Sequence, residues 1–316
     1  MQPLCVAGID AGQRFLDLGL APSGQTSRYE NNASGIARLL ERLQHAGVAR
    51  VVLEAIGSYA RPLLLALAEA GLAVGIVNPR RIKAFRDAEG RRAKTDRLDA
   101  QLIARFALVM DDAVRPLPDA DAHALKALSV RRRQLTELVA IEKTRLKQAT
   151  EPLVADSHKA AIAALTEACK GIEAAINTRI ARDPERKEAR RLLVSIPGIG
   201  ERVSSVLLTE LPELGRRDRK TIASLVGLAP HVSQSGNAPP RAAIAGGRPC
   251  VRAALYMSAL VAVRHDPVQK AAYRAFRAEG KPAKVALVAI ARRILVTANA
   301  ILKTKQPYSP HDRLDP

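Results

Sequence analysis

Short apolar runs and segments of helical spacing alternate along the first third of the chain. Four apolar runs have the length of strands and lie at 4–9, 15–20, 49–53 and 72–77. Four segments repeat apolar residues at helical spacing, at 34–47, 58–70, 79–85 and 95–110. A turn-like segment separates the first two runs, so they are predicted to form a hairpin. This order predicts an α/β sheet with parallel crossovers and one antiparallel pair at its start.

The remainder of the chain is predicted to be helical. After a linker rich in Asp and Pro, two long helices are expected from residue 123 to about 193, with an interruption near Glu151 and Pro152. They would form an antiparallel arm resembling a coiled coil. The region from Leu192 onward is predicted to be mostly helical, and its end to be a disordered tail. The expected parts are 1–112, 113–190, 191–306 and 307–316.

The net charge of +19 over 316 residues is unusual, whereas a hydrophobic content of 47% is ordinary for a globular protein. Residues 191–316 contain 20 Lys and Arg against 8 Asp and Glu, a net of +12. A basic region of this kind favours a polyanionic partner, nucleic acid before an anionic membrane. Aromatic residues make up only 3% of the chain and Trp is absent, which disfavours modules that bind nucleic acid by base stacking.

The sequence predicts neither membrane insertion nor secretion. No apolar run is predicted to reach the roughly 18–20 residues that span a bilayer. The N-terminus lacks a basic segment followed by an apolar one, so no signal peptide is expected. Three scattered cysteines show neither metal-binding spacing nor a disulfide framework. A cytoplasmic protein is therefore expected.

Asp96 and Asp99 lie three residues apart at the start of a predicted helix and therefore share a face. Two neighbouring carboxylates repel each other unless a cation lies between them, and Mg²⁺ prefers oxygen ligands. Lys94 and Arg97 would suit a phosphate brought to that metal. The alternative is a solvated helix start, where acids interact favourably with the helix dipole.

Two further acids follow predicted strands. Asp10 ends the first strand, and Glu54 ends the strand after the first helix. If these strands are neighbours, their carboxyl ends meet at one edge of the sheet, where ligand sites form. Together with Asp96 and Asp99 they would make a cage for one or two Mg²⁺ (or Mn²⁺) ions. Taken singly, Asp10 is also explained as a turn residue and Glu54 as a helix-start acid.

Two segments in the basic region are candidates for nucleic-acid contact. Ser195–Gly200 followed by an apolar helix is typical of a helix-hairpin-helix, in which Gly198 and Gly200 expose backbone N–H groups to a phosphate. The alternative is a plain turn between two packed helices. Lys281 and Lys284 open a late helix and are predicted to face nucleic acid, with a solvated helix face as the alternative.

The N-terminal motifs resemble those of the DEDD transposases of bacterial insertion sequences. They are Gly8-Ile9-Asp10, Leu53-Glu54-Ala55-Ile56-Gly57-Ser58-Tyr59, Asn78-Pro79 and Ala93-Lys94-Thr95-Asp96-Arg97-Leu98-Asp99-Ala100. The resemblance implies an RNase H-like (RuvC-like) N-terminal domain. It also implies that the four family acids correspond to Asp10, Glu54, Asp96 and Asp99.

The C-terminal motifs resemble the transposase domain of the same family. They are Leu225–Pro230, Ser233–Gly236, Gly246–Arg248 and Val251–Tyr256. In that family the Ser of the Ser-Gly pair attacks DNA and forms a phosphoserine intermediate, and Ser235 corresponds to it. The resemblance places Arg241, Arg248 and Arg252 near the scissile phosphate. The stretch Asn237–Pro240 departs from the family pattern, and Ser233 is disfavoured because no Gly follows it.

The resemblance implies a DNA transposase or recombinase that cleaves and rejoins strands through Ser235, assisted by Mg²⁺ or Mn²⁺ on the four acids. Donor and target DNA, a structured non-coding guide RNA and a homo-oligomer (dimer or tetramer) are the implied partners. One alternative is a RuvC-like metal-dependent endonuclease that uses water. Another is a non-enzymatic DNA- or RNA-binding protein with structural acids. A nucleophilic Tyr256 is a lesser variant, because that residue follows an apolar helical pattern typical of a core.

Overall fold

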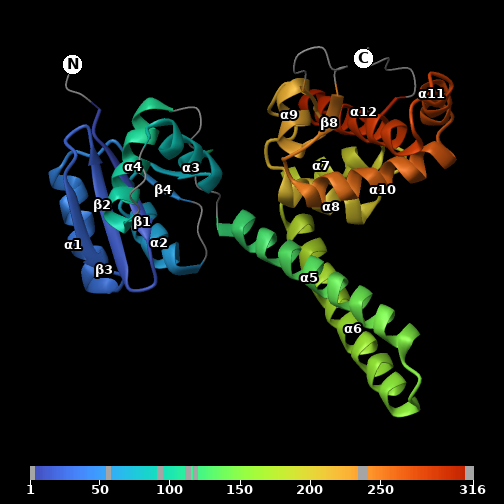
Figure 1. Cartoon of the computed structure of the whole chain (residues 1–316), viewed down its shortest axis with the longest axis horizontal. Coiled ribbons are helices and arrows are strands. Elements are labelled where there is room, and N and C mark those ends of the chain that lie inside the picture. Colours follow the sequence, from blue (N-terminus) through green and yellow to red (C-terminus); the bar gives the residue numbers. More distant parts are fainter. Residues whose placement is uncertain are drawn as a thin grey trace. The chain divides into compact units, whose positions relative to one another are not determined.

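The computed structural model divides the chain into two compact units, Met1–Asp119 and Ala120–Pro316 (Figure 1). It describes residues 4–54, 58–90, 95–110, 115–116, 120–233 and 241–309. The first unit is α/β and the second is almost entirely helical, as the sequence pattern predicts. The two helices of the predicted arm belong to the second unit together with the helices that follow them.

The first unit is built on a mixed six-stranded sheet with the order β3-β2-β1-β4-β5-β6. Its strands are β1 (Val6–Ala11), β2 (Phe15–Ala21), β3 (Thr26–Glu30), β4 (Arg50–Glu54), β5 (Val74–Val77) and β6 (Arg115–Pro116). The first three are joined antiparallel, whereas β4 and β5 run parallel to β1. This mixed sheet fits the RNase H-like arrangement expected for the N-terminal part.

Two strands of this sheet were not predicted. β3 contains the polar sequence Thr-Ser-Arg-Tyr-Glu and alternates between exposed and half-buried residues at an edge of the sheet. It has no apolar run to mark it, because only one of its faces packs against other elements. β6 is only two residues long and pairs with β5 at the opposite edge. Both depend on pairing with a neighbour rather than on their own composition.

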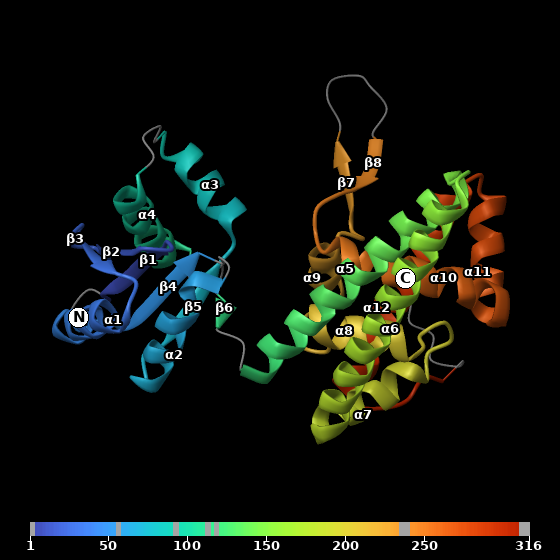
Figure 2. The same ribbon diagram turned by 90° about the horizontal axis from the view of Figure 1, so that it is seen from below.

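Helices cover both faces of the sheet (Figure 2). They are α1 (Ala33–His45), the short 3₁₀ helix η1 (Ser58–Ala60) leading into α2 (Arg61–Glu69), α3 (Pro79–Ala88) and α4 (Asp96–Val109). One core joins α1 and α2 to alternate residues of the central strands, including Ile9, Leu18 and Leu53. A separate core joins α3 and α4 to the opposite face, including Val6 and Val52. Because side chains alternate along a strand, residues in step with Val6 and Val52 face α4.

Two glycines allow α4 to lie directly on the sheet. Gly8 and Gly19 are paired across β1 and β2. A Cβ built on Gly8 would come within 2.3 Å of the Ala100 carbonyl oxygen, and one on Gly19 within 2.6 Å of the Gln101 Cα. Backbone atoms cannot give way as a flexible side chain can. The absence of a side chain at Gly8 and Gly19 therefore determines how close the first turns of α4 come to the strands.

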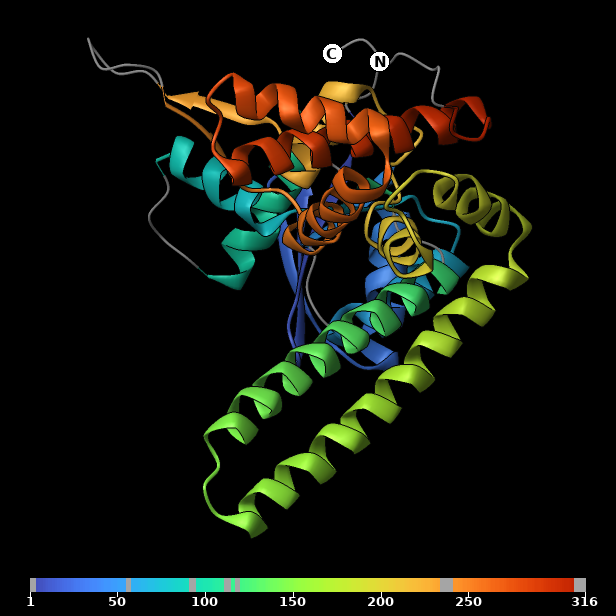
Figure 3. The same cartoon turned by 90° about the vertical axis from the view of Figure 1, so that its right-hand side faces the viewer.

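Two long antiparallel helices begin the second unit and lie side by side as a hairpin (Figure 3). They are α5 (Ala120–Gln148) and α6 (Pro152–Arg182), so the predicted interruption near Glu151 is confirmed. At the base of the hairpin, Leu125, Ile176 and Ile180 form a small core against which Leu208 packs. Ser129 also donates a hydrogen bond to Glu210, at 3.0 Å. These contacts attach the arm to the helices that follow it.

The remaining helices enclose one large apolar core. They are α7 (Pro184–Val194), α8 (Glu201–Glu210), α9 (Arg219–Val226), α10 (Pro249–His265), α11 (Pro267–Ala278) and α12 (Ala283–Thr304). A hairpin of β7 (Pro230–Ser233) and β8 (Arg241–Ile244) interrupts them and was not predicted from the sequence. Strands this short carry too few residues for a period of two to be recognised.

One helix, α12, is long and apolar enough by length and composition to span a membrane, although Arg292 and Arg293 interrupt its apolar sequence. This helix has 22 residues and a mean hydropathy of 1.8 over its most apolar window. Its apolar residues, among them Ile290 and Leu295, are buried in the helical core of the second unit. A core helix of this kind meets the same length and composition criteria as a spanning helix, and it is weak evidence for a membrane.

The start of the predicted tail is ordered against the helical core. The backbone N–H of Tyr308 donates a hydrogen bond to Ser195 Oγ at 2.9 Å, and the Tyr308 side chain packs against the core. Residues 307–309 are therefore not a disordered tail. The rest of the predicted tail, 310–316, lies outside the described residues.

Candidate active site

Four neighbouring strands bring polar side chains to the face of the sheet that α4 covers. Asp10 lies directly opposite Asp17 in the β1–β2 pair, and Asp17 lies opposite Arg28 in the β2–β3 pair. On the other side of β1, the parallel register sets Ile9 opposite Leu53, so Asp10 and Glu54 follow at neighbouring carboxyl ends. Residues opposite each other share a face, which makes this a polar row across four strands.

The start of α4 adds two more acids to this row. Thr95 caps the helix, its side-chain oxygen accepting a hydrogen bond from the Leu98 N–H at 3.3 Å. Asp96 and Asp99 follow in the first turn. Asp96 is 68% exposed, whereas Asp99 is 10% exposed. The helix start that the sequence predicts is confirmed, and both acids lie at its N-terminal end.

Burial and the negative charges of four neighbouring acids raise the pKa of Asp10. Burial raises its pKa most, followed by the charges of Asp96, Asp99, Glu54 and Asp17, and together they bring the pKa of Asp10 to about 6. An effect of this kind requires the charges to lie near one another. The structure therefore brings together the four acids singled out from the sequence, with Asp17 as a fifth.

Each acid of α4 is held by an arginine from another element. Arg28 Nη2 donates to Asp96 Oδ2 at 3.0 Å, and Arg86 Nη2 of α3 donates to Asp99 Oδ1 at 2.6 Å. Sequence reasoning missed both arginines and instead pointed to the adjacent Lys94 and Arg97. Arg97 is exposed on α4, and Lys94 lies outside the described residues.

Asp17 was also missed, although the sequence carried a signal for it. It is the one charged residue inside the apolar run of β2, and it is only 2% exposed. A buried carboxylate requires a partner, which here is Arg28 at 2.8 Å. The identity of that partner could not be read from the run itself.

The donor set fits a hard divalent cation. In the part of the chain that the structure describes, no three His, Cys, Asp or Glu side chains are already gathered in metal-binding geometry. The acids nevertheless offer only carboxylate oxygens, the ligands that Mg²⁺ and Mn²⁺ prefer. Burial and, after it, the repulsion of the neighbouring acids raise the pKa of Asp10, and a cation among the acids would relieve that repulsion.

The second candidate centre lies between β7 and β8. Ser235 belongs to the segment that joins these strands and lies outside the described residues, as do Asn237 and Pro240. Ser233 and Arg241 are opposite each other in the last described rung of the hairpin. His231, a candidate general base for the serine, lies two residues before Ser233 and is exposed.

The C-terminal motifs converge at the base of this hairpin. Gly227 and Gly247 both have positive φ, and a Cβ on Gly247 would come within 2.2 Å of the Gly227 nitrogen. Arg252 Nη1 donates to the carbonyl oxygens of Val226 at 3.2 Å and Gly246 at 2.8 Å. These contacts tie the end of α9 to the turn before α10, and so hold the two ends of the hairpin together.

Arg248 has a similar structural task. Its two terminal nitrogens donate to the two oxygens of Glu213 at 2.6 and 2.7 Å, and Nη1 also donates to the Glu210 carbonyl at 2.8 Å. Both Arg248 and Arg252 are thus engaged within the chain. Their contact with a scissile phosphate stays a prediction.

The predicted helix-hairpin-helix lies at the α7–α8 connection. Gly198 has a φ of +90°, and a Cβ there would come within 2.4 Å of the Ser258 carbonyl of α10, so its role in the structure is close packing. Gly200 is exposed, and a Cβ on it would meet nothing within 4 Å. Of the two glycines, only Gly198 is thus needed for close packing, and a phosphate contact by Gly198 or Gly200 stays a prediction.

The two lysines of the late helix differ in surroundings. Lys281 is paired with Glu279 at 2.7 Å, and its Nζ lies 4.3 Å from the centroid of the Phe276 ring. Lys284, in the first turn of α12, is exposed. Of the two, Lys284 is the side chain more available to a polyanion.

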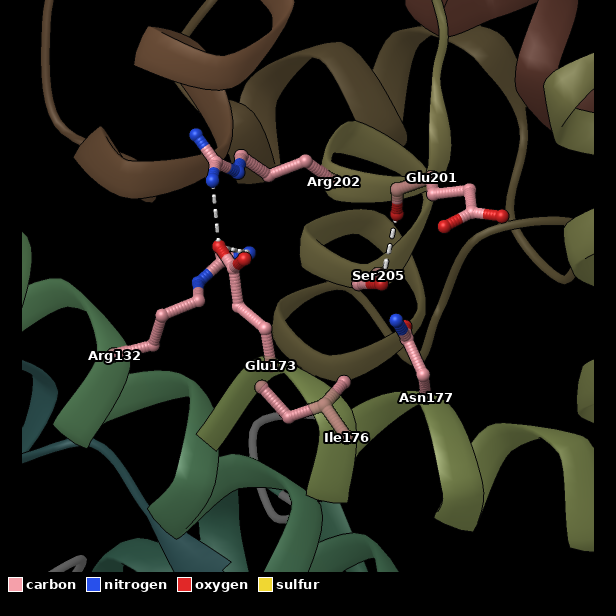
Figure 4. Close-up of a pocket in the computed structure, with 7 residues that line it drawn as sticks. All are labelled: Arg132, Glu173, Ile176, Asn177, Glu201, Arg202 and Ser205. Carbon is pink, nitrogen blue, oxygen red and sulfur yellow. Dashed lines mark hydrogen bonds and ion pairs between the residues drawn. The ribbon is translucent and has the colours of Figure 1, made fainter. Parts of the chain in front are cut away.

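A pocket of about 140 Å³ lies where the arm meets α8 (Figure 4). Arg132 of α5 and Arg202 of α8 both point toward Glu173 of α6, at 4.0 and 2.9 Å. Burial lowers the pKa of Arg132, whose side chain is only 12% exposed. The ion pairs connect three helices, so we interpret this pocket as a structural junction rather than a second active site.

Known proteins with similar sequences are transposases and recombinases. Residues 7–151 match the IS110 DEDD transposase family, and residues 190–274 match the transposase IS116/IS110/IS902 family. A pilin gene-inverting protein of Moraxella bovis is 28% identical over 313 residues, which cover 95% of this chain and 96% of that protein. An uncharacterized 43.6 kDa protein of insertion element IS110 from Streptomyces coelicolor is 30% identical over 165 residues, 49% of this chain and 38% of that protein.

A solved structure also matches the chain. RuvC of T. thermophilus, in complex with a Holliday junction substrate, aligns with 22% identity and a TM-score of 0.29. The match covers 36% of this chain and 99% of that one.

Proposed function

Because the chain belongs to the IS116/IS110/IS902 family of DEDD transposases, and is thus a transposase or DNA recombinase, we propose that it exchanges DNA strands through a serine nucleophile and a carboxylate-bound metal. The observation that carries the metal half of this proposal is the convergence of Asp10, Glu54, Asp96 and Asp99 on one face of the sheet. The serine half rests on the match of Ser235 to the family motif.

Asp10, Glu54, Asp96 and Asp99 would hold Mg²⁺ or Mn²⁺. When bound, such an ion neutralises charge on the phosphate and favours ionisation of a nearby nucleophile. The residues of the chain supply the orientation. Arg28 and Arg86 hold the carboxylates of α4, and Gly8 and Gly19 set the distance of α4 from β1 and β2.

The proposed reaction at Ser235 has two balanced steps. In the first, Ser235 Oγ gives up its proton and bonds to the phosphorus, and the departing strand end leaves as a hydroxyl after taking up a proton. In the second, a hydroxyl of another strand attacks the phosphoserine ester and restores a phosphodiester while Ser235 regains its proton. Each step exchanges one phosphate ester for another, and neither hydrolyses the phosphodiester. The strands can therefore be rejoined without a further energy source.

The partners follow from the same proposal. Donor and target DNA are the substrates, which places the enzyme in the bacterial cytoplasm at the nucleoid. The relative named for gene inversion aligns along nearly the whole chain, which supports strand exchange rather than simple hydrolysis. A structured guide RNA and a dimer or tetramer with composite sites are the remaining parts of the proposal. The net charge of +12 in residues 191–316 is compatible with a nucleic-acid partner. The α7–α8 turn, at Gly200, would contact a phosphate as a helix-hairpin-helix.

A trapping experiment tests the mechanism. The full chain is incubated with Mn²⁺ and with the DNA that flanks its gene. Covalent protein–DNA adducts are then separated on a denaturing gel. Wild type is expected to form an adduct, whereas Ser235→Ala and Asp10→Asn form none and lose strand exchange by on the order of 10³-fold or more. Cleavage by Ser235→Ala at the normal rate without an adduct would instead establish the water-using endonuclease. Full recombination by Asp10→Asn would show that the acids are structural.

A further inference from the structure

The buried ion pair of Asp17 and Arg28 reaches the candidate metal site through a third residue. We propose that this pair positions the carboxylate of Asp96 for a divalent cation; the inference rests on the proposed metal site. Arg28 is accordingly a positioning residue that acts on the cation only through Asp96. The contact joins residues 68 positions apart in the chain.

The guanidinium of Arg28 is fixed before it reaches Asp96. Nε donates to Asp17 Oδ1 at 2.9 Å and Nη2 to Oδ2 at 2.8 Å, a two-point contact that sets the plane of the group. The Phe15 ring restrains it further, with its centroid 5.0 Å from Cζ. A group held in this way can in turn orient the Asp96 carboxylate, which accepts a further hydrogen bond from Nη2.

The orientation of the Asp96 carboxylate depends on its hydrogen bond from Arg28. Asp96 lies in the first turn of α4 with 68% of its side chain exposed, so solvent alone would leave its carboxylate free to rotate. Arg28 binds Oδ2 at 3.0 Å, and within the described residues Oδ1 has no hydrogen-bond partner. One oxygen is thus held, and the other is available to a metal ion near Asp10.

Asp17 keeps Arg28 from opposing the metal. An unpaired guanidinium beside Asp96 would repel a divalent cation and compete for both carboxylate oxygens. The side chain of Asp17 is 2% exposed, cancels the charge of Arg28 and occupies two of its donors. The pair therefore supplies orientation with no net charge, as partners behind metal ligands do in other sites.

The test is the affinity of the full-length chain for Mn²⁺, measured from the electron paramagnetic resonance signal of the free ion. The double variant Asp17→Asn with Arg28→Gln leaves the net charge unchanged and removes the two-point contact. Its affinity for Mn²⁺ is expected to fall about 10-fold. Arg28→Gln alone makes the site more negative by one charge. A purely electrostatic role would therefore tighten binding in this variant, whereas a positioning role weakens it.

A matched control comes from the other end of α4. Arg105 and Glu89 form an ion pair of 2.7 Å, and the double variant Glu89→Gln with Arg105→Gln should bind Mn²⁺ as wild type does. Hydrogen–deuterium exchange of the first unit verifies that each variant is folded.

Two outcomes count against the positioning role, and a third counts against the metal site. Wild-type affinity in the Asp17→Asn, Arg28→Gln double variant overturns it. If that variant does not fold, tighter binding by Arg28→Gln overturns it instead. If wild type binds no Mn²⁺, or binds it with the same affinity as Asp10→Asn, the proposed metal site itself is overturned. That result differs from the first two because it does not involve Asp17 or Arg28.

Discussion

The two units of this chain use their arginines in different ways. In the first unit, Arg28 and Arg86 reach across from other elements to the carboxylates of α4. In the second, Arg248 and Arg252 bind Glu213 and backbone carbonyls, and so hold the base of the β7–β8 hairpin together. A count of basic residues therefore overstates how many can meet nucleic acid, because some already have partners within the chain.

The difference also shows how each candidate centre is built. The acids of the first unit come from strand ends and one helix start, and a rigid sheet brings them together. Ser235 belongs to a segment between two short strands, and what the structure determines is the base from which that segment emerges. The acids are positioned by a sheet and a close-packed helix, whereas glycine contacts and arginine hydrogen bonds hold together the described base of the β7–β8 hairpin.

The glycine contacts between α4 and the sheet should give the largest effect on stability. Gly8→Ala places a Cβ 2.3 Å from the Ala100 carbonyl oxygen, so α4 must move away. We expect the first unit to lose about 3 kcal/mol. Because a chain of two units need not unfold in one step, hydrogen–deuterium exchange of peptides from each unit is the suitable measurement.

A matched glycine lies in the other unit. Gly171 is inside α6, and a Cβ there would meet nothing within 4 Å. Gly171→Ala should therefore stabilise the arm, by about 0.5–1 kcal/mol. If Gly171→Ala destabilised the second unit as Gly8→Ala destabilises the first, the effect at Gly8 could not be assigned to its close approach to α4.

Arg248 tests whether the second unit needs its arginines for structure. Arg248→Met leaves Glu213 without its two-point partner, and both side chains are largely buried, at 21% and 16% exposed. The loss is expected to be about 2–3 kcal/mol, with faster hydrogen exchange in α8, α10 and the hairpin base. Unchanged exchange together with lost DNA cleavage would instead assign Arg248 to the phosphate.

Asp10 should lower the stability of the first unit at neutral pH. Its pKa is raised from 3.8 to about 6, so the folded state prefers the neutral acid. The part of the stability that depends on the Asp10 proton is therefore fully present below about pH 4 and is lost as the pH rises through 6. Asp10→Asn avoids this loss and should be more stable than wild type by about 1–2 kcal/mol at pH 7.5, with no difference near pH 4.

The same titration supplies a check with metal. Mg²⁺ should remove most of the difference between wild type and Asp10→Asn at pH 7.5, because the ion relieves the repulsion in wild type only. A difference that is equal at both pH values would show that the pKa of Asp10 is not raised. A pH-dependent difference that Mg²⁺ leaves unchanged would show that burial, rather than the neighbouring acids, raises it.

Lys284 should give the smallest effect. It is exposed in the first turn of α12, so Lys284→Gln is expected to leave stability within about 0.5 kcal/mol of wild type. If it binds a backbone phosphate, the slope of log affinity for DNA against log salt should fall by about 1. An unchanged slope would make Lys284 part of a solvated helix face.

Much of the candidate metal site could be predicted from the sequence. Asp10 and Glu54 are recognisable because each ends an apolar run, and Asp96 and Asp99 because they begin a helix after Thr95. Strand ends and helix starts are local features, so neighbouring residues are enough to reveal them. Ser235 was identified through its match to a family motif, and that assignment stays a prediction.

The sequence by itself determined the alternation of strands and helices, the two arm helices and the acids at strand and helix ends, because these depend on periodicity within a few residues. Only the tertiary structure decided that β3 joins the sheet, that Gly19 lies under α4, and that Arg28 links Asp17 to Asp96. Arg28 and Asp96, for example, are separated by 68 positions in the chain. Their pairing is decided by sheet register and by helix packing, which no local pattern of residues encodes.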